Sequence, residues 1–162
     1  MPCAGEDESD ATLLLFISYY VIILTMKTFK NNSKYHHATH LMYSCKYHVV
    51  FCPKYRRKVL VDGIDTRLKE IFLETALGHQ FEITDLEVMP DHVHILIDCN
   101  PRYGIMQCVK DLKRESASLL VKEFPHLKSR LPNIWTRNTF IGTVGSVSLE
   151  TVKRYIKNQK NV

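Results

Sequence analysis

The chain contains no CxxC pair, and its five cysteines, an odd number, are scattered between Cys3 and Cys108. This pattern excludes the regular disulfide framework of small secreted domains. We therefore expect free thiols in a reducing compartment, the cytoplasm. A zinc site among the histidines and cysteines from His36 to Cys52 is a weaker alternative, because their spacing matches no usual four-ligand pattern. On one continuous strand, Cys45 and Cys52 would also lie on opposite faces.

No apolar run is long enough for a typical membrane helix. The longest, residues 13–24, is broken only by Ser18 and falls short of the roughly 20 residues that a span requires. The first 25 residues carry four acidic and no basic residues, unlike a secretory signal. We expect residues 1–25 to be an extension before a native start at Met26, and residues 26–162 to form one domain without stable membrane association. A partner-docked helix or a membrane anchor are the alternatives.

The rest of the chain is strongly basic. From Met26 on, 22 basic residues face 13 acidic ones, a net charge of +9. Apolar residues make up 45% of the whole chain, which argues against disorder. A small folded domain with this excess favours a polyanionic partner, most commonly nucleic acid. The charge alone leaves open the alternative of a basic domain that has no such partner.

Hydrophobic periodicity predicts seven elements in the order β-α-β-β-α-β-α. The strands are expected over residues 43–51, 81–89, 92–99 and 139–144, and the helices over residues 64–77, 105–124 and 149–159. Gly78 is expected to cap the first helix and Ser148 the last. Residues 27–41 are polar and predict an arm. The order predicts an α+β fold, the ferredoxin-like split βαβ with an antiparallel sheet, plus a C-terminal helix.

One strand carries two histidines on the same face. Because side chains alternate along a strand, His92 and His94 project together while Val93 points into the core. Two neutral imidazoles make half of a metal site, although a pair of solvated histidines is the plainer alternative. His48 lies on the first strand and either borders this site or packs in the sheet.

The last helix carries a second pair, Tyr155 and Gln159. Their spacing places them on one helix face, among the basic residues Lys153, Arg154, Lys157 and Lys160. Alone, this pair is better explained by an amphipathic helix whose tyrosine packs.

Together the two pairs resemble a known family. The sequence is similar to the HUH single-tyrosine transposases of bacterial and archaeal insertion sequences over residues 40–160. The segments that carry the resemblance are YHVVF (47–51), KYRRKVL (54–60), EVMPDHVHIL (87–96), TVG (143–145) and KRYIKNQ (153–159). Thr139 departs from the pattern, which usually has an aromatic residue before Phe140.

The resemblance implies a reaction and its residues. Tyr155 would be the nucleophile, and His92, His94 and Gln159 would bind Mg²⁺ or Mn²⁺. The reaction would cleave and rejoin single-stranded DNA, in the form of hairpin ends of the element, through a 5′-phosphotyrosine, and the protein would be a homodimer. The basic residues expected to contact DNA are Lys54, Arg56, Arg57, Lys58, Arg154 and Lys157.

Two alternatives remain. A domesticated HUH nickase would use the same chemistry. An RNA-binding module without catalysis could use the same scaffold, but it requires aromatic side chains on a central strand, and residues 92–97 contain none.

Overall fold

The computed structural model describes residues 35–145 and 149–158. Every described residue belongs to one compact unit, Tyr35–Val162. The predictions for residues 1–25, for the Ser148 cap and for Gln159 therefore lie outside the described residues. The described elements, in chain order, are β1 (His36–Ala38), β2 (Leu41–Tyr43), β3 (Lys46–Phe51), η1 (Lys54–Arg56), α2 (Ile64–Gly78), β4 (Phe81–Met89), β5 (His92–Cys99), α3 (Ile105–Glu123), α4 (His126–Arg130), β6 (Phe140–Thr143) and α5 (Leu149–Asn158).

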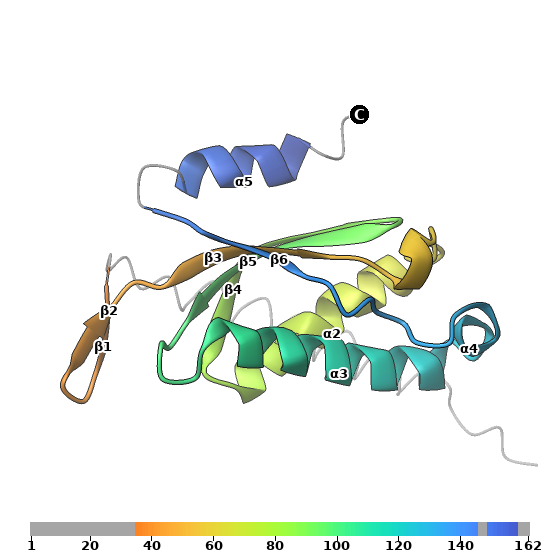
Figure 1. The fold of residues 1–162 in the computed structure, drawn as a ribbon, viewed down its shortest axis with the longest axis horizontal. Coiled ribbons are helices and arrows are strands. Elements are labelled where there is room, and N and C mark those ends of the chain that lie inside the picture. Colours follow the sequence, from red (N-terminus) through yellow and green to blue (C-terminus); the bar gives the residue numbers. More distant parts are fainter. Residues whose placement is uncertain (1–34, 146–148, 159–162) are drawn as a thin grey trace, which may run out of the picture. The chain divides into compact units, whose positions relative to one another are not determined.

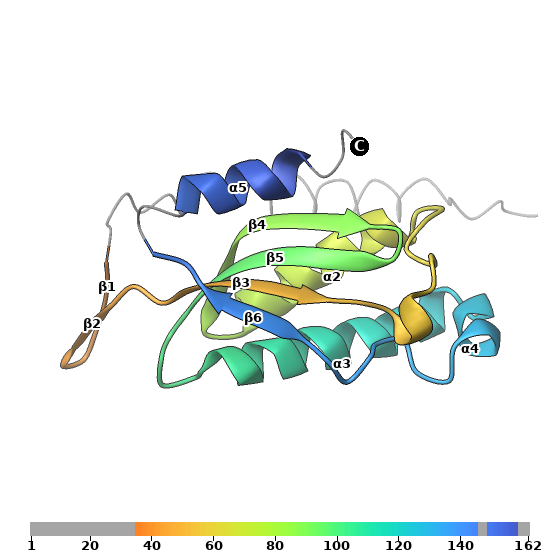
Figure 2. The ribbon, with the colours of Figure 1, turned by 45° about the horizontal axis from the view of Figure 1, so that its top comes forward.

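The main sheet has four strands in the order β4-β5-β3-β6, and each neighbouring pair is antiparallel (Figure 2). Helices α2 and α3 cover one face of this sheet, and α5 lies on the other (Figure 1). This is the ferredoxin-like arrangement of two split βαβ units. The α+β prediction is confirmed.

The core lies between the sheet and the two helices. Strand β5 contributes Val93, Ile95 and Ile97, which are all fully buried, because alternate residues of a strand share a face. Helices α2 and α3 meet them with apolar stripes that include Phe72 and Leu112. The opposite faces of β3, β5 and β6 are left for α5 and for the polar side chains described below.

The N-terminal part of the first predicted strand differs from expectation. Tyr43 belongs to β2, which pairs with β1 in a separate two-stranded hairpin, and β3 begins only at Lys46. The expected arm over residues 27–41 is thus wrong for residues 36–41. His40 adopts a φ of 58° in the turn, and strands of three residues are too short to produce a readable alternation.

Helix ends also correct the sequence predictions. Gly78 is the last residue of α2, and His79 caps the helix by donating its N–H to the Ala76 carbonyl. The left-handed glycines of the described chain precede the helices instead, at Gly63 and Gly104. The short helix α4 was not predicted, and β6 is two residues shorter than expected. Among the described residues, no helix is long and apolar enough to cross a membrane.

Candidate active site on the open face of the sheet

The two histidines of β5 lie side by side on the face away from α2 and α3. Their ring centroids are 4.9 Å apart and their planes meet at 77°. Val93 between them is fully buried in the core, as the strand period predicts. His94 is only 5% exposed, and His92 is partly exposed. The pair is therefore largely withdrawn from bulk water.

Each of these imidazoles contacts a neighbour through Nδ1. His92 Nδ1 lies 2.6 Å from Asp91 Oδ1. His94 Nδ1 lies 3.0 Å from His48 Nε2 of the adjacent strand β3, and the two ring planes are nearly parallel, with centroids 5.3 Å apart. His48 thus borders the histidine pair, which is one of the two interpretations that the sequence allows.

Burial keeps His94 neutral. Burial, together with the nearby His92 and His48, lowers the pKa of His94 to about 4, although the carboxylate of Glu87 opposes this effect. Burial also lowers the pKa of His48. Near neutral pH both rings are uncharged, and the neutral imidazole is the form that binds a metal ion.

The basic segment 54–58 contacts Asp91, the residue before His92. Arg56 Nε donates to Asp91 Oδ2 over 3.0 Å, and the Leu60 N–H donates to the Pro90 carbonyl just before Asp91. The segment accommodates these contacts with a φ of 51° at Arg56. Burial alone would raise the pKa of Asp91, but its contacts with His92 and Arg56 outweigh burial and lower it. Asp91 is therefore ionised at neutral pH.

Helix α5 packs across the same open face. Ile156 is fully buried against Leu96 of β5 and Val144, and the helix also contacts β4. Tyr155 lies within α5, but its side chain and the residue Gln159 fall outside what the structure describes. Arg154 and Lys157 are exposed.

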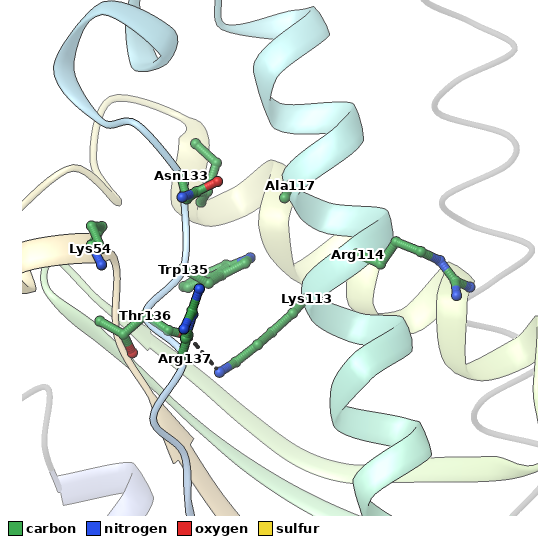
Figure 3. A pocket seen from close by; sticks show the side chains of 9 residues that line it. Lys54, Lys113, Arg114, Ala117, Asn133, Trp135, Thr136 and Arg137 are labelled. Atoms are coloured by element: carbon green, nitrogen blue, oxygen red, sulfur yellow. Dashed lines mark hydrogen bonds between the residues drawn. The ribbon is translucent and has the colours of Figure 1, made fainter.

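The predicted basic patch is exposed, and one member lines a cavity. Arg56, Arg57 and Lys58 are exposed. Lys54 lines a hollow of about 600 Å³ between α3 and residues 133–137 (Figure 3). The exposed Arg137 also lines this cavity, a candidate DNA contact that sequence reasoning missed, because it is isolated in sequence from the other basic residues.

Lys113, another residue of this cavity, has a different role. Its ammonium donates to the Thr136 and Asn138 carbonyls and to Thr139 Oγ1, over 2.7 to 3.2 Å. All three of its donors therefore hold residues 136–139 against α3, and Lys113 has none left for a ligand.

The site resembles half of a metal centre within the described chain. Residues 35–145 and 149–158 contain no cluster of three or more His, Cys, Asp or Glu side chains that could hold a metal ion. The described residues thus bring together two of the three predicted ligands, His92 and His94.

Comparisons with known proteins agree with this architecture. The family model described as "Transposase IS200 like" matches residues 41–159. The ISDra2 transposase TnpA of Deinococcus radiodurans is 37% identical over 120 residues, which cover 73% of this chain and 86% of that protein. The transposase of insertion sequence element IS200 from Salmonella typhimurium is 30% identical over 122 residues, covering 74% and 80%.

Solved structures give the same result. A putative transposase from Deinococcus radiodurans superposes with a TM-score of 0.65 and 36% identity, over 76% of this chain and 97% of that one. A REP-associated tyrosine transposase bound to a REP hairpin has a TM-score of 0.57 at 14% identity, over 76% of this chain and 71% of that one, and supports the fold alone. The family match excludes the RNA-binding module without catalysis. The chain belongs to the IS200-like transposases and is a DNA transposase.

Proposed function

We propose that this transposase cleaves and rejoins single-stranded DNA at the ends of an insertion sequence, with Tyr155 as nucleophile. The observation that carries the proposal is the pair His92 and His94 on one strand, in which His94 is buried and uncharged near neutral pH. The pair lies on the sheet face across which the helix of Tyr155 packs. The family match supplies the reaction class.

The histidine pair fits a divalent cation. Both Nδ1 atoms contact Asp91 or His48, so Nε2 is the nitrogen through which each ring would bind the ion. Gln159 is the proposed third ligand. Mixed imidazole and amide ligation favours Mn²⁺, and cellular abundance favours Mg²⁺. When bound, the ion would act as a Lewis acid and orient the scissile phosphate.

Tyr155 would make the covalent link. Its oxygen attacks phosphorus and forms a P–O bond, while the bond from phosphorus to the 3′ oxygen breaks. The phenol loses its proton, and the departing 3′ oxygen gains one and leaves as a hydroxyl. The 5′-phosphotyrosine retains the energy of the phosphodiester, and a different 3′-hydroxyl can therefore reverse the step without ATP. A phenol has an ordinary pKa near 10, so the bound ion and neighbouring cations would have to favour its ionised form on attack.

The basic residues would hold the DNA backbone. Lys54, Arg56, Arg57, Lys58, Arg154 and Lys157 are the proposed contacts, and Arg137 extends this set into the cavity beside Lys54. We propose hairpin ends of the element as the substrate, since the structurally similar REP-associated transposase was solved with a REP hairpin. We also propose that the protein acts as a homodimer.

A covalent-adduct assay tests the reaction. The full chain is incubated with labelled single-stranded element ends and Mg²⁺ or Mn²⁺, and a protease-sensitive DNA–protein adduct is expected. Tyr155→Phe should abolish the adduct while leaving DNA binding near wild type, because only the nucleophilic oxygen is removed. His94→Ala should also abolish it.

Two outcomes would contradict the proposal. An adduct formed by Tyr155→Phe would assign the nucleophile to another residue. Full cleavage by the wild type in excess EDTA would exclude the metal-dependent reaction.

A further inference from the structure

The two proposed metal-binding histidines each meet a hydrogen-bonding partner at the same ring atom. For His92 the partner is the carboxylate of Asp91, 2.6 Å from Nδ1. For His94 it is the imidazole of His48, 3.0 Å from Nδ1. The first partner is a sequence neighbour, whereas the second is 46 positions away on another strand. The Nδ1 atom of each ring therefore has a hydrogen-bonding partner, which is adjacent in sequence for His92 and distant in sequence for His94.

We propose that Asp91 and His48 are positioning residues that keep the proton of each ligand histidine on Nδ1, so that both Nε2 atoms carry the lone pair that binds the metal. This inference rests on the metal site of the proposed function. Outer partners of this kind fix the tautomer and the ring orientation of metal-binding histidines.

For His92 the direction of the hydrogen bond follows from charge. An ionised carboxylate has only acceptors, so Asp91 Oδ1 accepts and His92 Nδ1 donates. Arg56 holds the other carboxylate oxygen over 3.0 Å, which restricts rotation of the Asp91 side chain. The carboxylate and the ring therefore keep one relative orientation.

For His94 the direction depends on which ring gives the proton. If His48 donated from Nε2, the proton of neutral His94 would lie on Nε2, and that atom would have no lone pair for a metal ion. If His94 donates from Nδ1, His48 Nε2 accepts, and the lone pair that can bind a metal ion lies on His94 Nε2. The two ring planes differ by only 12°, which is the near-coplanar orientation that a hydrogen bond between ring nitrogens favours.

The first test measures the tautomer directly, without metal or DNA. Long-range ¹H–¹⁵N NMR of the imidazoles in the full chain, recorded at neutral pH, should show His94 and His92 protonated on Nδ1. A histidine that is free in water favours the proton on Nε2, so the expected signature differs from the default. A His94 proton on Nε2 in the wild type would overturn the inference for His48.

The second test measures Mn²⁺ affinity in the absence of DNA, by the EPR signal of free Mn²⁺. His48→Phe removes the acceptor at similar size, and Asp91→Ala removes the carboxylate. Each should weaken Mn²⁺ binding by roughly 10- to 100-fold. His48→Gln, which offers an acceptor oxygen, should recover part of the loss. Asp91→Asn should lose less than Asp91→Ala.

Matched controls change a histidine and an aspartate outside the proposed site. His126→Phe changes an exposed histidine on α4, and Asp62→Asn changes an exposed aspartate; both should leave Mn²⁺ affinity unchanged. If His48→Phe does not fold, the wild-type NMR measurement still decides the tautomer.

The outcomes separate this inference from the proposed function. If the wild type does not bind Mn²⁺, or if His94→Ala binds it as well as the wild type does, the metal site itself is wrong. If the wild type binds Mn²⁺ and His94→Ala does not, the metal site is supported. If His48→Phe and Asp91→Ala then keep an Mn²⁺ affinity within about twofold of the wild type, only the positioning role is wrong. The expected loss of affinity is roughly tenfold or more.

Discussion

Replacing Ile156 should detach the C-terminal helix α5 from the sheet face that carries His92 and His94 while leaving the fold intact. Ile156 is fully buried against Leu96 and Val144, in a cluster separate from the core between the sheet and α2 and α3. Ile156→Ala removes three buried carbon groups, about 2.4 kcal/mol of apolar burial at about 0.8 kcal/mol for each. That corresponds to a roughly 50-fold shift toward the undocked helix, since about 1.4 kcal/mol is tenfold.

The assay is the single-turnover rate of adduct formation at saturating DNA, measured alongside thermal unfolding. The Ile156→Ala rate should fall by as much as about 50-fold, because Tyr155 precedes Ile156 on the same helix. Ile156→Val removes one methyl group, about 0.8 kcal/mol, and should fall by about fourfold at most. The main unfolding transition should change little in both variants.

Asn158→Ala, at an exposed position of the same helix, is the matched control and should react at the wild-type rate. A wild-type rate for Ile156→Ala would refute the reasoning, since the helix would then be positioned by something other than this contact. A large drop in the main unfolding temperature would also refute it, because Ile156 would then belong to the cooperative core.

Three further predictions concern binding, stability and assembly. Binding to single-stranded DNA should weaken steeply with salt, and Arg57→Ala and Lys58→Ala should each reduce the log–log slope by about 0.7; an unchanged slope would remove those side chains from the interface. Asp111 is buried, which alone would raise its pKa, but hydrogen bonds from Tyr103 and Gln107 and the nearby Arg114 outweigh burial and lower it. The Asp111 carboxylate therefore stabilises the fold above its unfolded-state pKa of about 3.9, and this stabilisation is lost as the pH falls through the lower folded-state pKa. The unfolding temperature of Asp111→Asn should therefore change less with pH in that range than the unfolding temperature of the wild type. Finally, if the homodimer shares its sites, mixing Tyr155→Phe with His92→Ala subunits should restore adduct formation that neither variant has alone, and no recovery despite subunit exchange would show that each subunit uses its own tyrosine.

Local pattern was sufficient to predict the strands β4 and β5 at their observed bounds. Both are long enough to alternate clearly, and Pro90 marks the short turn between them. The same alternation placed His92 and His94 on one face, because side-chain direction along a strand depends only on position. Helical periodicity likewise predicted α2 and α3 to within one residue at each end. These features are properties of short segments, so the sequence alone determines them.

Contacts between distant segments were decided only by the tertiary structure. The register of β3 on β5, which pairs Val50 with His94, brings His48 within 3.0 Å of the His94 ring. Arg56 meets Asp91 from 35 positions away, and Arg137 joins Lys54 at one cavity. Local periodicity does not predict these contacts, because they depend on strand pairing and on loop conformations that form only when the whole core is packed. The sequence therefore determined which residues could bind a metal ion, and the fold determined which neighbours hold them.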